Sequence, residues 1–107
     1  MRFFNSKKIE FFLKNLFLSE QFLLKKRAER FYHNRTEREI CYLSNIVDQS
    51  KASIDIGVYR GVYSYYLCQN SNFVYAFEAN PLLIDKLNKG FLKYKNIRIE
   101  NLAVSSS

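Results

Sequence analysis

A short loop in the middle of the chain carries residue types that suit the binding of a small ligand. Asp55, Gly57 and Gly61 follow the pattern D-x-G-x-x-x-G at the end of an apolar run. Glycine lets the backbone turn sharply and approach a ligand closely, because it has no side chain. A carboxylate, Glu78, stands 17 residues after Gly61, and a carboxylate can accept both hydroxyl hydrogens of a ribose. The pattern therefore predicts a nucleoside-binding loop.

The spacing of the glycines distinguishes between two kinds of nucleotide. Dinucleotide-binding loops carry G-x-G-x-x-G, which places a pyrophosphate on a helix N-terminus. Here only one further glycine, Gly61, follows Gly57 in the loop, and it stands between Arg60 and Val62. This spacing favours a nucleoside ligand without a pyrophosphate. A fragment of a dinucleotide-binding oxidoreductase is kept as an alternative.

Three segments have the composition of β-strands. Residues 52–56 (A-S-I-D-I), which end at Gly57, predict a short buried strand, and the apolar run 73–77, which ends at Glu78, predicts a second short strand. Residues 96–104 alternate apolar and polar side chains and predict a third strand. Ligands of open α/β sheets bind at the carboxyl ends of the strands. Gly57 and Glu78 stand at two of these ends.

Helices are expected before and between the strands. Thr36 and Glu39 have the T-x-x-E spacing of a capping box, which predicts a helix that stops near residue 49. Residues 62–68 form a second candidate helix. Asn80 and Pro81 suit the N-cap and the first position of a third helix, which is predicted to run to about residue 93.

This alternation predicts an α/β fold: three parallel strands that form the first half of a Rossmann-like doubly wound sheet. Such a sheet leaves an edge or a face without cover. We therefore expect residues 36–107 to be the N-terminal half of a cofactor-binding domain, completed by further chain after Ser107 or by a partner. Residues 1–35 are expected to form a basic helical extension.

The extension carries most of the positive charge. Of the net charge of +7, residues 1–35 hold +6, from nine Lys or Arg and three Glu. Ser19 suits the N-cap of a second helix in this segment. Three interpretations stay open: packing on its own domain or on a partner, an interfacial helix on an anionic membrane, and nucleic-acid contact, which we do not expect. The apolar residues that recur at helical spacing are Ile9, Leu13, Leu16, Leu24, Ala28 and Phe31.

Cysteine usage and hydropathy argue for a reduced compartment. Cys41 and Cys68 lack the spacing of a metal site, and the chain has one histidine, so we expect buried thiols and no metal. The N-terminus lacks the apolar stretch of a signal peptide, and no run is long enough to cross a bilayer. The expected location is the cytoplasm.

Residues 53–105 resemble the start of S-adenosylmethionine-dependent methyltransferases, and among these the FkbM family. The matching segments are S-I-D-I-G (53–57), R-G-V-Y-S (60–64), V-Y-A-F-E-A-N-P (74–81) and N-L-A-V-S (101–105). The chain departs from the family at Val58 and Tyr59, where Ala-Asn is common, and at Ala79, where proline is common.

The resemblance implies S-adenosylmethionine as cofactor. Asp55, Gly57 and Gly61 would shape the loop around its methionine moiety, and Glu78 would hold the ribose hydroxyls. Ala79 and Asn80 would lie beside the adenine or ribose, with the segment 101–103, which includes Leu102, on the adenine side. The candidate cofactor-binding residues are Asp55, Gly57, Val58, Tyr59, Gly61, Glu78, Ala79, Asn80, Asn101 and Ala103.

Family members typically transfer a methyl group to a hydroxyl of a sugar, glycan or secondary metabolite. The resemblance thus implies a small-molecule or glycan acceptor in the full-length enzyme. Residues that position the acceptor normally come from later strands, so none is assigned here, and we expect the 107 residues alone to be inactive. A non-catalytic remnant that binds a partner or a membrane through its basic arm is the other alternative.

Overall fold

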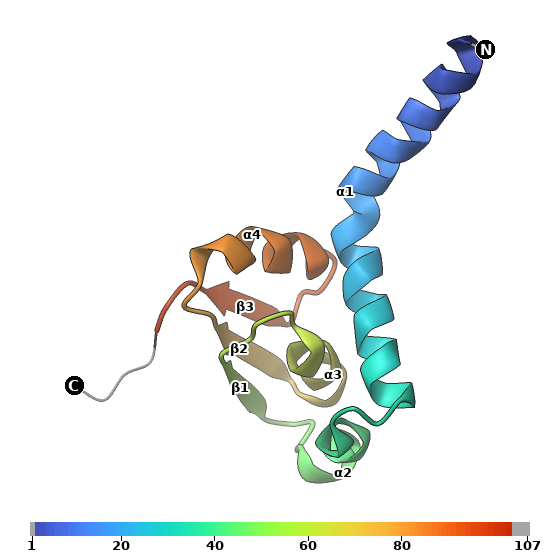
Figure 1. Ribbon diagram of the computed structural model, residues 1–107. Coiled ribbons are helices and arrows are strands. Elements are labelled where there is room, and N and C mark those ends of the chain that lie inside the picture. The colour runs from blue at the N-terminus through green and yellow to red at the C-terminus, as the bar shows by residue number, and fades with distance from the viewer. Residues whose placement is uncertain (1, 104–107) are drawn as a thin grey trace.

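The computed structural model describes the backbone of residues 2–103, and within that range all side chains except those of residues 2–6 and 11–19. The strands form one three-stranded sheet, and Figure 1 shows helices packed beside this sheet and one long helix that extends away from it. In chain order the elements are α1 (Arg2–His33), η1 (a 3-10 helix, Arg38–Tyr42), α2 (Leu43–Ile46), β1 (Ala52–Ile56), α3 (Val62–Asn70), β2 (Phe73–Phe77), α4 (Pro81–Gly90) and β3 (Ile97–Glu100).

The strands form one parallel sheet in the order β1-β2-β3. The register pairs Ile54 with Tyr75, and Tyr75 with Arg98. Because the strands run parallel, a helix connects each to the next, and all three end at the same edge of the sheet. The predicted α/β class with three parallel strands is therefore confirmed.

One face of the sheet carries the hydrophobic core. Val74 and Ala76 on β2 are fully buried, and they cluster with Leu67 of α3 and Leu87 of α4. Leu24 of α1 joins the same cluster, so α1 lies over the two helices and not on the sheet. The core thus consists of the sheet, a layer with α3 and α4, and α1 outside them.

The opposite face of the sheet is open within the described residues. Side chains alternate between the faces of a strand, and Ser53 and Asp55 take the covered face of β1. Ile54 and Ile56 therefore point the other way and are 64% and 61% exposed, beside Tyr75 at 42%. The position of β1 agrees with the prediction, but the expectation that it is buried is wrong for its two isoleucines.

The basic extension is a single helix. α1 continues through Ser19, where a second helix was predicted to begin. No glycine or proline occurs between Arg2 and His33, so nothing in the backbone chemistry interrupts the helix. Ser19 therefore lies in the interior of the helix and is not an N-cap.

Only part of α1 packs on the rest of the chain. Leu24 and Ala28 are buried, and the Tyr66 hydroxyl of α3 donates a hydrogen bond of 2.8 Å to the carbonyl of Ala28. Ile9, further toward the N-terminus, is 57% exposed, and Figure 1 shows this half of α1 extending past the sheet. Among the interpretations of the arm, packing on its own domain holds for this C-terminal half.

The segment between α1 and β1 differs most from the prediction. The capping box of Thr36 and Glu39 does not form: Glu37 is the N-cap of η1, and it makes no side-chain capping bond. The Glu37 carboxylate instead accepts a hydrogen bond from the hydroxyl of Tyr63 on α3. A contact distant in sequence thus replaces the local one, and the predicted helix is two short ones, η1 and α2.

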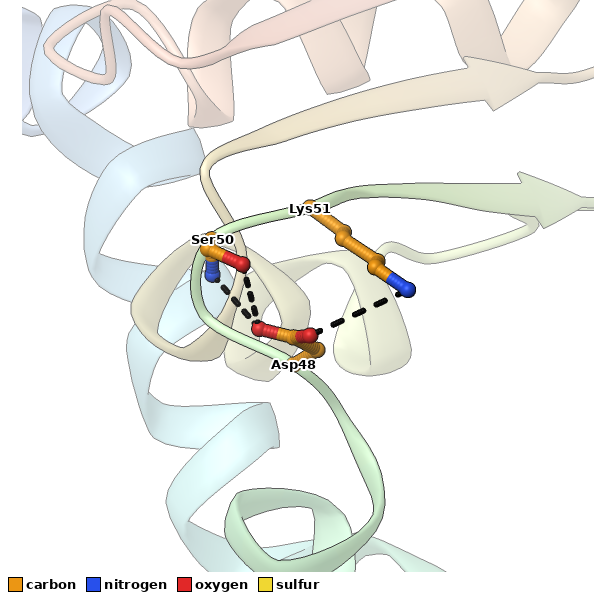
Figure 2. Close-up of polar contacts among 3 residues, drawn as sticks. All are labelled: Asp48, Ser50 and Lys51. Carbon is orange, nitrogen blue, oxygen red and sulfur yellow. Dashed lines mark hydrogen bonds and ion pairs between the residues drawn. The ribbon is translucent and has the colours of Figure 1, made fainter.

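A tight turn leads into β1 (Figure 2). The backbone N–H and the hydroxyl of Ser50 donate hydrogen bonds of 2.9 and 2.7 Å to Oδ1 of Asp48. Lys51 Nζ lies 4.0 Å from the other carboxylate oxygen. The bonds from Ser50 lower the pKa of Asp48, because they stabilise its charged form.

The beginning of α4 follows from its sequence. The Asn80 side chain accepts a 3.0 Å bond from the backbone N–H of Leu82, and Pro81 opens the helix, as predicted. The helix ends at Gly90, about one turn before the predicted end.

β3 ends at Glu100, earlier than predicted. The backbone N–H of Leu102 folds back and donates a 3.0 Å hydrogen bond to the carbonyl of Glu100. Residues 104 and 105 lie outside the described residues.

The two cysteines, both predicted to be buried, differ in burial. Cys68 is buried, whereas Cys41 is half-buried and points at the carbonyl of Tyr32. Burial raises the pKa of the Cys68 thiol to about 12.

Among the described residues of the range 2–103, no group of three His, Cys, Asp or Glu could hold a metal ion. In the same range no helix has the length and hydropathy needed to span a bilayer.

Candidate functional site

The carboxyl ends of the three strands bring the candidate residues together. Gly57 follows β1, Glu78 follows β2 and Asn101 follows β3. Backbone bonds hold these ends in register: the Gly57 N–H donates to the Phe77 carbonyl at 2.8 Å, and the Glu78 N–H donates to the Glu100 carbonyl at 3.0 Å. Three segments that are far apart in sequence therefore form one edge.

Glu78 is the centre of this edge. Its side chain is only 7% exposed. Oε1 accepts a bond of 2.7 Å from the backbone N–H of Tyr59, and Oε2 accepts one of 2.8 Å from the N–H of Asn80. Each carboxylate oxygen has a second lone pair, so the group can still accept two further hydrogens. Glu78 thus ties the loop after β1 to the start of α4 and keeps acceptor capacity for a ligand.

Gly57 gives this loop its sharp turn and leaves space beside it. Its φ is +76°, in the left-handed region that side-chain-bearing residues rarely adopt. A Cβ built at Gly57 would meet no heavy atom within 4 Å. The open space lies at the carboxyl end of β1, where the resemblance puts the methionine moiety; contact with a cofactor stays a prediction.

Gly61 has a different role from the predicted one of approaching a ligand. Its φ is +88°, and a Cβ there would lie 2.9 Å from Phe91 Cε2 and 3.2 Å from Leu24 Cδ1 and Leu87 Cδ2. Its missing side chain therefore lets α3 begin tightly against α1 and α4. Its place in the loop agrees with the prediction, but the close approach observed is to the core.

Val58 and Tyr59, two of the three residues at which the chain departs from the FkbM pattern, differ in accessibility. Val58 is 5% exposed and belongs to the core, so its side chain is turned away from solvent. Tyr59 has a positive φ of +55°, and its ring is 61% exposed. The bond from its N–H to Glu78 holds this unfavourable backbone conformation in place. The Arg60 guanidinium lies 5.5 Å from the centre of the Tyr59 ring.

Asp55 points at the helix layer. The hydroxyl of Ser64, a fully buried residue of α3, donates a 2.5 Å bond to its Oδ2. Burial raises the pKa of Asp55; the bond from Ser64 opposes this rise, and the charge of Glu78 adds to it. Asp55 thus positions the loop by linking β1 to α3. Sequence reasoning did not find Ser64, whose only signal is a small polar residue within an apolar helical segment.

Asn101 joins the ends of β2 and β3. Its Nδ2 donates to the carbonyl of Glu78 at 2.9 Å and to that of Ala79 at 3.0 Å. Ala79 and Ala103 are exposed beside it. Asn80, also exposed, uses its side-chain oxygen to cap α4. These residues stand at the edge where the sequence interpretation puts them, and their contact with a cofactor stays a prediction.

The comparison with solved structures identifies the fold. One similar structure is a 23S rRNA methyltransferase, ErmE, with a TM-score of 0.54 and 18% sequence identity. The match covers 61% of this chain and 28% of that one, so the chain spans less than a third of the length of that enzyme. No protein-family model and no curated protein sequence match. The chain therefore has a methyltransferase-like α/β fold.

Proposed function

We propose that the chain is the cofactor-binding portion of an S-adenosylmethionine-dependent methyltransferase related to the FkbM family. The observation that carries the proposal is the Glu78 carboxylate, held by two backbone N–H groups at the ligand-binding edge of a methyltransferase-like sheet. The segments quoted for the resemblance support the finer assignment. The identity with ErmE is too low for its rRNA substrate to bear on this chain.

The described residues fit this cofactor. The free lone pairs of Glu78 suit two ribose hydroxyls, and the space beside Gly57 suits a group that approaches the backbone. Bound S-adenosylmethionine supplies a methyl group on a positively charged sulfur. Glu78 would orient the ribose, and Asp55 would hold the loop through Ser64. Asn101 would fix the edge at which the adenine lies.

The acceptor proposed from the FkbM resemblance is a hydroxyl of a sugar, glycan or secondary metabolite. Methyl transfer depends largely on alignment of the acceptor with the sulfur, so positioning supplies much of the catalysis. None of the described residues is proposed as the acceptor site. The proposal therefore concerns cofactor binding by this chain and methyl transfer by the whole enzyme.

The test is calorimetric titration of the chain with S-adenosylhomocysteine, the demethylated cofactor. Glu78→Gln should weaken binding by about 10-fold to 100-fold, because hydrogen bonds to a charged group contribute about 1.5–3 kcal/mol. Glu100→Gln is the matched control: Glu100 ends the neighbouring strand and pairs with Arg98, so binding should change less than about twofold. Thermal unfolding of both variants shows whether the loss reflects misfolding.

Two results would contradict the proposal. One is an affinity for S-adenosylhomocysteine that is the same in Glu78→Gln and in the unaltered chain. The other is competition in which NAD displaces S-adenosylhomocysteine and binds more tightly, which would favour the oxidoreductase alternative. A folded chain that binds neither ligand would favour the non-catalytic alternative.

A further inference from the structure

A cavity lies outside the edge formed by the carboxyl ends of the strands, between α1, α4 and the residues that precede α3. Arg27 comes from α1, Arg60 from the loop before α3 and Lys86 from α4. Its volume is about 130 Å³, below the roughly 300–1,000 Å³ of sites for drug-sized ligands, so it suits a small group. The cavity thus draws three cationic side chains from three separate segments.

These cations lack carboxylate partners. No ion pair involves Arg27, Arg60 or Lys86 among the described side chains. Glu20 is the one acidic residue that lines the cavity, so three cations and one carboxylate leave a net charge of +2. Partial burial lowers the pKa of Arg27, the charges of Arg60 and Arg30 lower it further, and the charge of Glu20 opposes this lowering. Like charges repel each other, and an anion in the cavity would offset the repulsion between Arg27 and Arg60.

Part of the cavity wall is apolar. Leu23 of α1, which is 44% exposed, and Leu83 of α4, which is half-buried, supply this apolar surface. A free inorganic anion would leave this wall unused. An anionic group attached to an apolar body would use both parts of the cavity.

We propose that this cavity binds a phosphate monoester carried on an apolar or aromatic group. A phosphate monoester has about −1.5 to −2 charges at neutral pH, which balances the net charge of the lining. Two guanidinium groups present planar donors that match phosphate oxygens, and an ammonium adds a point charge. The cavity adjoins the Glu78 edge, but its three cations are not among the candidate cofactor-binding residues. Tyr59 connects the two, because its N–H bonds Glu78 and its side chain lines the cavity.

Phenyl phosphate is the probe, titrated into the whole chain by calorimetry at low ionic strength. Arg27→Gln and Lys86→Gln should each weaken binding about tenfold or more, because each removes a charge-assisted bond. The matched control is Lys89→Gln, an exposed lysine of the same helix that does not line the cavity; it should change the affinity less than about twofold. Inorganic phosphate should bind more weakly than phenyl phosphate, because it leaves the apolar wall empty.

Vesicles separate the two sources of such a group. Phosphatidic acid carries a phosphate monoester on a lipid, and phosphatidylcholine vesicles are the control without one. Co-sedimentation with phosphatidic acid vesicles that Arg27→Gln abolishes and Lys89→Gln preserves would assign the site to a lipid headgroup. Binding of phenyl phosphate without co-sedimentation would assign it to a soluble phosphate monoester.

The proposal is overturned if neither phenyl phosphate nor phosphatidic acid vesicles bind. It is also overturned if Arg27→Gln and Lys86→Gln bind as tightly as Lys89→Gln, or if inorganic phosphate binds as tightly as phenyl phosphate. Circular dichroism of each variant establishes that it is folded, so a loss of binding is assigned to the cavity.

Discussion

The two positive-φ glycines of the loop after β1 give a matched experiment on how tightly this fold is packed. Gly57 and Gly61 have φ values of +76° and +88°, so alanine is strained at both. The added methyl group meets open space at Gly57 but lies 2.9 Å from the ring of Phe91 at Gly61. The difference between the two variants therefore isolates the packing contribution.

The magnitudes follow from these surroundings. The left-handed conformation destabilises a non-glycine residue by about 1–2 kcal/mol, and both variants should lose this amount. Forcing an extra carbon into a packed core destabilises by a further 1–3 kcal/mol or so. Phe91 is 3% exposed and cannot swing away into solvent. Gly61→Ala should thus lose about 2–5 kcal/mol, a large share of the roughly 5–15 kcal/mol by which a domain is stable.

Urea unfolding followed by circular dichroism measures both losses. With a slope of about 2 kcal/mol per molar urea, Gly61→Ala should shift the midpoint by about 1–2.5 M, and Gly57→Ala by about 0.5–1 M. The gain from a less flexible unfolded chain is the same in both alanine variants, so it cancels in the comparison. Equal losses in the two variants would refute the packing argument.

Three further predictions concern single groups. The pKa of Asp55 is raised above its ordinary 3.8 in the folded chain, so its contribution to stability is full below pH 3.8 and is lost as the pH rises through the folded pKa. Asp55→Asn should flatten this decline in the free energy of unfolding, measured with urea across about pH 3–7. An unchanged pH dependence in the variant would argue against a buried carboxylate. Cys68 is buried and its thiol has a pKa of about 12, so it should react with iodoacetamide only after unfolding, whereas Cys41 should react in the folded chain. Peptide mass spectrometry measures both rates of modification, and equal rates in the folded chain would show that Cys68 is accessible. Asn80→Ala should destabilise the chain by about 1 kcal/mol, because it removes the cap on the Leu82 N–H. Asn80→Asp, which can still accept this hydrogen bond, should be as stable as the unaltered chain. An equally large loss in Asn80→Asp would rule out the capping role.

The elements that the sequence predicts well are those fixed by local chemistry. The strands at 52–56 and 73–77 are short segments with turn residues at both ends, and the structure has them at those positions. The cap at Asn80 depends only on Asn, Pro and the N–H two residues on. The parallel order follows from the alternation of strands and helices. Each of these needs information from a few neighbouring residues.

What the sequence could not show depends on contacts between distant residues. Glu37 bonds Tyr63, 26 residues further on, and this contact accompanies the loss of the expected capping box. In the candidate site, Glu78 was predicted as a ribose acceptor from its position alone. Its two backbone bonds, and the approach of Gly61 to Phe91, require the folded arrangement. Apolar periodicity likewise does not say which face of β1 the helices cover.

The alternation of β1 between a covered and an open face has a consequence for how substitutions in it would be tolerated. Ser53 and Asp55 face the helix layer, so changes there act on folding and on the loop that follows. Ile54 and Ile56 are 64% and 61% exposed on the other face, so polar replacements there remove no core contact within the described residues. A complete substitution scan of this strand, read as yield of folded chain, would therefore alternate with a period of two residues. The tolerant positions would be the two most hydrophobic ones in the strand.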